Sequence, residues 1–258
     1  MEPRSEGPDF VGAGVQKCGS TWLAEVLRQH PGIFLPKKEI KFYCRKFRKG
    51  YPWYHNWFNN KRDRMAGDFS PLYLITPLCY LSRKSLRPKW ARRGLYFLRK
   101  NPSARDELKA HYPGIRVFAI FRNPIDRAWS YYWFRIRRQK EWGKKTFPFE
   151  KMWAYNGRWI RTNGLYAHYL AYWREAFPDF GIFFYDDIQI DPLGLARSVF
   201  RFIGVDDGFT PDFRHWPLKG EYEPMPGEIK KMLVDFYREE IVRFAEMTGR
   251  DLSHWLEF

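Results

Sequence analysis

The chain has 258 residues, of which 45% are hydrophobic and 20% aromatic, enough to bury a sizeable core without covalent staples. This composition excludes intrinsic disorder as a description of the whole chain. Lysine and arginine number 45 against 29 acidic residues, which gives a formal net charge of +16. We therefore expect an anionic partner: nucleic acid, anionic lipid, a polyanionic sugar or a phosphorylated small molecule.

Cysteine usage and the apolar runs exclude further classes. The three cysteines are too few for a disulfide framework, and without a C-x-x-C pair no metal site is predicted. The longest apolar run, around residues 117–121, is far shorter than the roughly 20 residues that cross a bilayer. Residues 1–7 lack a signal-peptide pattern, so we expect a cytoplasmic protein if residue 1 is the native start. If the chain is trimmed, a lumenal (Golgi) catalytic domain is the alternative.

Basic residues gather in three runs. Residues 37–49 hold seven basic residues and one acid, residues 81–100 hold eight and no acid, and residues 135–145 hold six and one acid. Any one run is compatible with a solvated surface. Three runs with so little compensating charge favour an anion-binding face.

The elements expected along the chain alternate between strands and helices. An apolar run at 10–13, a glycine-bounded loop and helical spacing at 20–30 predict strand, loop and helix. Later segments predict a short extended piece at 33–35, a loop at 68–74, an irregular basic stretch from 76 that turns helical up to His111, strands at 115–121 and 181–185, and helices at 125–138, 165–177, 192–203 and 229–247. This alternation predicts one α/β domain over residues 1–258, three-layered and P-loop-like, with a central parallel sheet and helices on both faces.

The loop after the first expected strand has the composition of an anion cradle. Gly14 and Gly19 have P-loop spacing, and backbone N–H groups converge at the N-terminus of the helix that follows. A nucleotide-hydrolysing P-loop has its lysine directly before the Ser or Thr, whereas Lys17 lies inside this loop. The strand at 115–121 ends in Arg122, where a magnesium-binding Asp would stand. Both departures argue against metal-assisted phosphoryl transfer, and an ordinary strand–helix turn stays an alternative.

The same loop, at 11–23, followed by His30-Pro31 and by Lys-Glu-Ile-Lys-Phe-Tyr at 38–43, resembles the sulfotransferases that use 3′-phosphoadenosine 5′-phosphosulfate (PAPS). The likeness is to the carbohydrate (heparan-type) and bacterial branch and runs from about residue 10 to the C-terminus. It implies PAPS as donor and 3′-phosphoadenosine 5′-phosphate (PAP) as product, with no metal. It assigns cofactor binding to Gly14, Gln16, Lys17, Cys18, Gly19, Ser20, Thr21, Trp22, Arg122, Ser130, Tyr166, Lys219 and Gly220.

Within that set the resemblance implies separate roles. The loop at 17–21 would bind the 5′-phosphosulfate, with Lys17 and backbone amides neutralising the leaving phosphate. Arg122 and Ser130 would hold the 3′-phosphate, the former through a forked guanidinium. The Lys219-Gly220 pair would close over the nucleotide.

The resemblance also implies a general base, Glu39, because the carbohydrate branch has its base in a matching Glu-x-x-Phe-aromatic stretch. Glu39 is the sole acid of the run at 37–49. Lys41 would touch the transferred group or an acidic acceptor. The alternative is a surface salt bridge from Glu39 to Lys37 or Lys41. The expected reaction moves a sulfuryl group to a hydroxyl of a saccharide or other polar acceptor, with an amine as the alternative acceptor group.

Some features depart from the family. Phe69 stands where heparan-type enzymes have a lysine near the reaction centre, and their paired late cysteines are absent. The basic stretch 81–100 resembles an insertion. Aromatic residues at 51–58 are either a sugar-stacking platform or core. Phe213, Trp216 and Tyr222 are candidates for stacking on adenine.

Two other functions compete with this assignment. A P-loop nucleotide kinase or NTPase would share the glycine loop and would depend on magnesium. A basic nucleic-acid binding protein would explain the net charge of +16. Because the sequence has no recognisable RNA-binding or helix-turn-helix signature, we expect no nucleic-acid partner.

Overall fold

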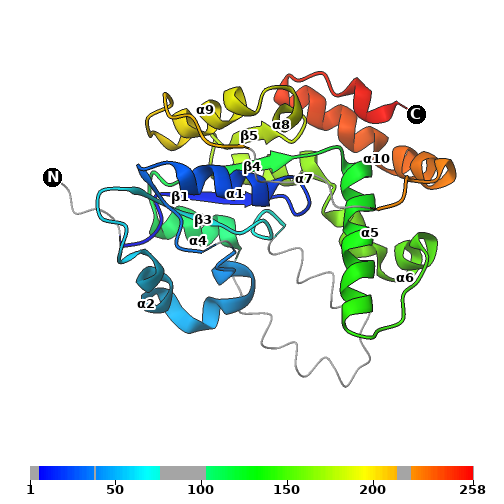
Figure 1. Cartoon of the computed structure of the whole chain (residues 1–258), viewed down its shortest axis with the longest axis horizontal. Helices are drawn as coiled ribbons and strands as arrows, with labels where there is room; N and C mark the ends of the chain where they lie inside the picture. Colours follow the sequence, from blue (N-terminus) through cyan, green and yellow to red (C-terminus); the bar gives the residue numbers. More distant parts are fainter. Residues whose placement is uncertain (1–5, 38, 76–102, 214–221, 258) are drawn as a thin grey trace. The chain divides into compact units, whose positions relative to one another are not determined.

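The structure of this protein is a computed structural model that describes residues 6–37, 39–75, 103–213 and 222–257 (Figure 1). The chain divides into two compact units. The first comprises Met1–Phe121 and Trp173–Trp216, and the second Arg122–Tyr172 and Pro217–Phe258. The single domain expected over the whole length stays a prediction, and the proposed insertion at 81–100 lies outside the described residues.

A parallel sheet forms the centre of the first unit. Its strands are β1 (Phe10–Gly14), β2 (Ile33–Phe34), β3 (Met65–Phe69), β4 (Arg116–Phe121) and β5 (Gly181–Phe184), in the order β2-β3-β1-β4-β5. All neighbours are parallel, and Val11 pairs with Asp68 on one side and Val117 on the other. The predicted parallel sheet is confirmed. In such a sheet, ligands bind outside the carboxyl ends of the strands, where the loop after β1 begins.

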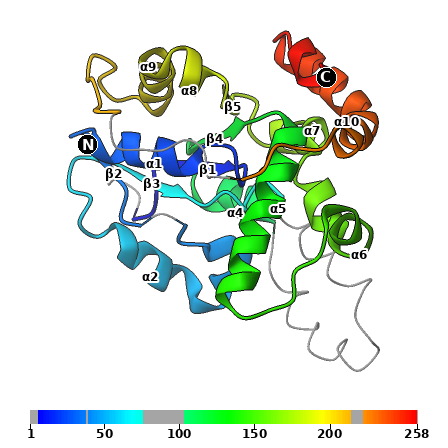
Figure 2. The same cartoon turned by 45° about the vertical axis from the view of Figure 1, so that its right-hand side comes forward.

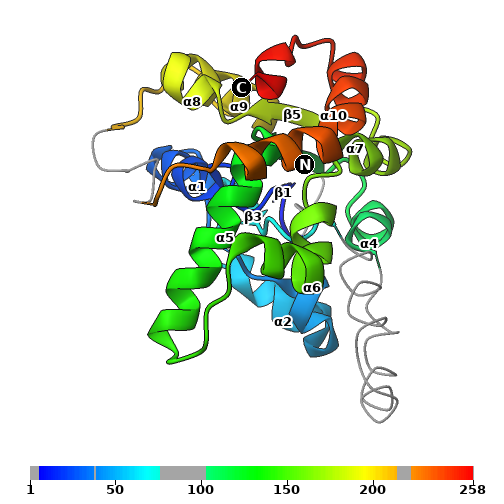
Figure 3. The same ribbon diagram turned by 90° about the vertical axis from the view of Figure 1, so that its right-hand side faces the viewer.

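Helices cover both faces of this sheet. The first unit holds α1 (Ser20–Gln29), α2 (Gly50–His55), α4 (Ala104–His111), α8 (Asp187–Ile190) and α9 (Pro192–Ile203), with short helical turns η1 (Phe42–Lys46), η2 (Phe47–Lys49) and η3 (Asn56–Phe58). Figure 3 shows α1 on one side of β1 and β3 and α4 on the other. The expected layering is therefore confirmed.

Strand β3 was not predicted, and the loop expected from residue 68 begins only after this strand ends at Phe69. Asp68 and Phe69 are its last residues. Gly67 and Asp68 are both disfavoured in strands, so local propensity obscured it. Its sheet position tolerates the carboxylate because three side-chain hydroxyls donate to it.

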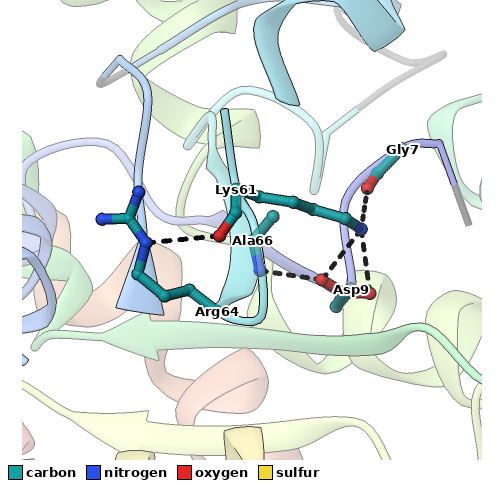
Figure 4. A network of polar contacts seen from close by, with 5 residues as sticks. All are labelled: Gly7, Asp9, Lys61, Arg64 and Ala66. Atoms are coloured by element: carbon teal, nitrogen blue, oxygen red, sulfur yellow. Dashed lines mark hydrogen bonds and ion pairs between the residues drawn. The ribbon is translucent and has the colours of Figure 1, made fainter. Parts of the chain in front are cut away.

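A buried lysine ties the start of β3 to the start of β1 (Figure 4). The Lys61 ammonium donates to the carbonyl of Gly7 at 3.0 Å and lies 3.2 Å from Oδ2 of Asp9. The same carboxylate oxygen accepts the N–H of Ala66 at 2.8 Å. These contacts satisfy a buried charge and fix the two strand starts together, so this cluster has a structural role.

The second unit is helical. It holds α5 (Pro124–Glu141), α6 (Phe149–Thr162), α10 (Gly227–Thr248), η5 (Ser253–Leu256) and most of α7 (Tyr166–Arg174). Figure 2 shows α6 beside α5, and the fully buried Arg127 of α5 donates to the carbonyl of Ile160 in α6. Tyr237 of α10 donates to the same carbonyl at 3.0 Å. Helix α6 was not among the expected elements. None of the described helices has the length and hydropathy needed to cross a bilayer.

Candidate functional site

The loop between β1 and α1 has the geometry expected of an anion cradle. Helix α1 begins at Ser20 with Gly19 as its N-cap, and neither a side-chain cap nor an acidic residue occupies its first turn. The first amides of an α-helix have no partner inside the helix, and the helix dipole adds positive potential there. An anion is therefore the natural partner of this helix end. Lys17, half-buried with a left-handed backbone, belongs to the same loop.

Gly19 is required by its surroundings. Its φ is +84°, and a Cβ at this position would lie 2.6 Å from Cδ1 of Ile188 and 2.9 Å from the ring of Tyr185. The loop backbone can therefore pass close beneath α8 only as glycine. Cys18 is fully buried, so the loop offers its backbone and not its thiol to a ligand.

Glu39 and Lys41 lie in a segment held against the end of β3. The N–H of Glu39 donates to the carbonyl of Phe69 at 3.0 Å, and Phe69 pairs with Gly12 in the sheet register. Since β3 and β1 are parallel neighbours, this segment and the loop after β1 lie at the same edge of the sheet. Oε2 of Glu39 is 2.5 Å from Nζ of Lys41, so the salt bridge considered as an alternative is present. Each side chain is less than one-third exposed, at 28% and 29% respectively.

Behind this segment lies a cluster that the sequence analysis did not identify. Asp68, Ser70, Tyr54 and Tyr73 are all fully buried. Burial raises the pKa of the Asp68 carboxyl to about 6, although hydrogen bonds from Tyr73, Ser70 and Tyr54 act in the opposite direction. Burial, together with the Asp68 charge, also holds the pKa of Tyr73 well above its usual value, so this phenol remains a donor. The available signal was a single charged residue in the stretch 66–75, whose other members are apolar apart from Ser70 and the hydroxyl of Tyr73.

Arg122 and Ser130 lie together in the second unit. Arg122 precedes α5, and its Nη2 is 3.9 Å from Oδ2 of Asp126. Ser130 is four residues beyond Asp126 on α5, so the two share one helix face. Asn123 accepts the N–H of Ile125 and caps this helix. A cation, a hydroxyl and a helix start in one place suit a phosphate group.

Several residues assigned to cofactor binding are buried, among them the aromatic residues Tyr166 and Trp22. Tyr166 is 1% exposed, and its hydroxyl donates to the carbonyl of Arg122 at 2.9 Å, so it helps to fix the backbone of that arginine. Trp22 is 5% exposed and stacks on Phe213 with ring centroids 5.7 Å apart. Lys219, Gly220 and Trp216 lie outside the described residues.

A model of the sulfotransferase family matches residues 8–211. This chain belongs to the sulfotransferase family. The expected membership is therefore confirmed, and the family takes its sulfuryl group from PAPS. Within the described residues, no group of three or more His, Cys, Asp or Glu side chains is arranged to hold a metal ion.

Curated relatives and a solved structure agree with this membership. The chain is 25% identical over 276 residues to mouse heparan sulfate glucosamine 3-O-sulfotransferase 3B1, covering 95% of this chain and 64% of the relative. It is 24% identical to human heparan sulfate glucosamine 3-O-sulfotransferase 6, covering 97% of this chain and 74% of the relative. The sulfotransferase of Alicyclobacillus acidocaldarius superposes with a TM-score of 0.77 at 23% identity, covering 97% of this chain and 99% of that one, and so shares its fold.

Proposed function

We propose that this chain transfers a sulfuryl group from PAPS to a hydroxyl, or alternatively an amine, of a saccharide, with Glu39 as general base. The observation that carries the proposal is the Glu39 segment, anchored at the end of β3 on the sheet edge where the glycine loop begins. The loop supplies an anion site, and the segment supplies a carboxylate and an ammonium. Sulfuryl transfer requires that the protein hold the donor in place and that it remove a proton from the acceptor.

The glycine loop fits the 5′ end of the donor. Lys17 and the amides at the start of α1 would hold the phosphosulfate, because that helix end has no side-chain cap and Gly19 admits no Cβ. Bound there, PAPS would supply the activated sulfuryl group. The positive charge of Lys17 would stabilise the phosphate as it takes up charge.

The 3′ end of the donor is assigned to Arg122 and Ser130, as the family resemblance implies. A guanidinium can form two parallel hydrogen bonds with a phosphate, and the Ser130 hydroxyl adds a third donor. Tyr166 would act through Arg122, whose carbonyl it holds. Lys219 and Gly220 keep the proposed role of closing over the nucleotide.

Glu39 would take the proton of the acceptor hydroxyl. The ammonium of Lys41 lies beside this carboxylate. An acceptor that reaches Glu39 must enter next to this ion pair. An anionic group on the acceptor would then have Lys41 as its partner.

A surface of lysine and tryptophan side chains favours an acceptor saccharide that carries negative charge. We name it the lysine–tryptophan surface: Lys37, Lys46, Lys49, Trp53 and Trp57. The ammonium groups of Lys46 and Lys49 lie 5.4 Å and 4.9 Å from the ring of Trp53, and that of Lys37 lies 5.6 Å from the ring of Trp57. The sequence has no acid between Glu39 and Asp63. Indole faces stack on sugar rings and ammonium groups pair with carboxylates or sulfates.

The test is an acceptor screen with labelled PAPS. The acceptors are desulfated glycosaminoglycans, simple sugars, phenols and lipids, each assayed with and without EDTA. We expect label in a saccharide and no loss in EDTA. Label in none of the saccharides would refute the acceptor class. Activity that appears only with ATP and magnesium would favour the nucleotide kinase instead.

Glu39→Gln tests the base. General bases contribute roughly 10²–10⁴-fold to rate, so we expect turnover to fall by about that factor with unchanged PAP affinity. Glu25→Gln is the matched control, because Glu25 is 22% exposed and paired with Arg28. Turnover of the Glu39 variant within a few-fold of wild type would remove Glu39 from the mechanism.

A further inference from the structure

The backbone of residues 39–42 is fastened to β3 and the stretch after it through four amide groups, of which that of Ile40 donates to the Asp68 carboxylate. The N–H of Glu39 donates to the carbonyl of Phe69 at 3.0 Å. The N–H of Lys41 donates to Oγ of Ser70 at 3.0 Å, and that of Phe42 to the hydroxyl of Tyr73 at 2.8 Å. Two of the four acceptors are therefore side-chain hydroxyls, which can either donate or accept.

One buried carboxylate decides which way these hydroxyls point. Oδ1 of Asp68 accepts the hydroxyl proton of Ser70 at 2.7 Å, and Oδ2 accepts that of Tyr73 at 2.6 Å. An ionised carboxylate can only accept hydrogen bonds, so each hydroxyl must donate its single proton to it. The lone pairs of both oxygens then face the amides of Lys41 and Phe42.

The segment needs such anchoring because its backbone is strained. Glu39 and Lys41 each have φ of +62°, in the left-handed region. A non-glycine residue in that region costs of order 1 kcal/mol and persists only where the surroundings fix it. Both residues are also the ones whose side chains carry the proposed chemistry.

We propose that Asp68 is a positioning residue for sulfuryl transfer, which sets the proton direction of Ser70 and Tyr73 and so holds residues 39–42 in the conformation that presents Glu39. This inference rests on the proposed function of Glu39. Asp68 touches no reacting atom in this scheme. It acts on the segment through the hydroxyls of Ser70 and Tyr73 and through the backbone N–H of Ile40, which donates to its carboxylate.

Tyr54 provides a matched control within the same cluster. Its hydroxyl also donates to Oδ2 of Asp68, at 2.9 Å, and its side chain is as buried as that of Tyr73. Among the described residues, its oxygen contacts none of the amides of the 39–42 segment. Tyr54→Phe and Tyr73→Phe therefore each remove one buried phenol oxygen from the same carboxylate, and the second change alone releases an amide of the segment.

The experiment compares the two variants with wild type in three measurements: kcat with labelled PAPS, PAP affinity by calorimetry, and hydrogen exchange at the amide of Phe42. We expect Tyr73→Phe to lower kcat at least about tenfold, since small misplacements of a catalytic group have effects of this size. Tyr54→Phe should stay within a few-fold. PAP affinity should be unchanged in both, and exchange at Phe42 should accelerate only in Tyr73→Phe.

Asp68→Asn is the second variant. It keeps the size of the side chain but replaces one acceptor oxygen with an NH2 group. This donor cannot accept the hydroxyl proton that the oxygen accepted. We expect the same loss of kcat with PAP affinity retained.

Equal losses of kcat in Tyr54→Phe and Tyr73→Phe would overturn the proposal, because they would show a general structural role. Unchanged kcat and unchanged exchange in Tyr73→Phe would overturn it as well. If wild type proves inactive with every acceptor, the proposed function fails by itself. The exchange measurement then still decides the anchoring, and equal rates at Phe42 in both variants would refute it.

Discussion

At the scale of single residues, the titration of Asp68 links the buried cluster to pH. Its carboxyl is fully buried, and burial raises the native pKa to about 6 from an ordinary value of 3.8. Between these two pH values the native carboxyl binds a proton that the unfolded one has already released. The contribution of Asp68 to the free energy of unfolding is therefore full below the unfolded pKa and is lost as pH rises toward the native one.

Asp68→Asn should remove this dependence. We expect the difference in unfolding free energy, wild type minus variant, to fall by about 1–3 kcal/mol as pH rises through the window from 3.8 to about 6. Urea denaturation at several pH values measures it. Asp235→Asn, at an exposed position of α10, controls for the loss of one negative charge. Parallel curves for wild type and Asp68→Asn would contradict the raised pKa.

At the scale of elements, η1, η2, α2 and η3 build the lysine–tryptophan surface. The sequence analysis left open whether the aromatic residues at 51–58 form core or a sugar platform, and the structure separates them. Tyr54 and Phe58 are buried, whereas Trp53 and Trp57 are half-buried beneath ammonium groups. A helical turn presents alternate faces, so one short segment supplies both core and surface.

Removing two charges of this surface tests its role in acceptor binding. For the double variant Lys46→Gln and Lys49→Gln, we expect the acceptor KM to rise about three- to tenfold and to depend less on salt, with kcat unchanged. Steady-state kinetics at several salt concentrations measure both effects. Lys230→Gln with Lys231→Gln, on α10, is the matched control for net charge. An equal rise of the acceptor KM in both double variants would contradict a contact at this surface, because it would show only long-range attraction by the net charge.

At the scale of the whole molecule, the residues proposed to hold the donor come from both compact units. Lys17 belongs to the first and Arg122 to the second. Arg122 directly follows β4 in the chain. PAP binding, measured with one residue changed at a time, tests each of these assignments separately.

Arg122→Ala should weaken PAP binding without unfolding the protein. Hydrogen bonds to charged groups contribute about 1.5–3 kcal/mol, so we expect the Kd for PAP to rise about 10- to 100-fold. Calorimetry measures the affinity, and a thermal melt checks folding. Arg105→Ala controls for loss of a mostly buried arginine, since the Arg105 side chain is 16% exposed and paired with Glu175. An unchanged Kd would contradict the 3′-phosphate assignment.

The sequence by itself determined the elements whose signals are local. Helix α9 has the predicted bounds because Pro192 begins it and Gly204 ends it with a left-handed backbone, so both boundaries are encoded within a few residues. The glycine loop was recognisable for the same reason. Its spacing and the segments that follow it in order were enough to indicate the family.

Only the tertiary structure decided the role of Asp68 and the existence of β3. Ser70 and Tyr73 lie close to that carboxylate in sequence, but the amides that their hydroxyls accept, from Lys41 and Phe42, lie 29 and 31 residues away from them. Periodicity reports which face of an element is apolar and contains no information about such long-range contacts. A buried acid surrounded by hydroxyls therefore looks like a break in a strand until the chain is folded, because no sequence period records that the chain turns these hydroxyls onto the carboxylate.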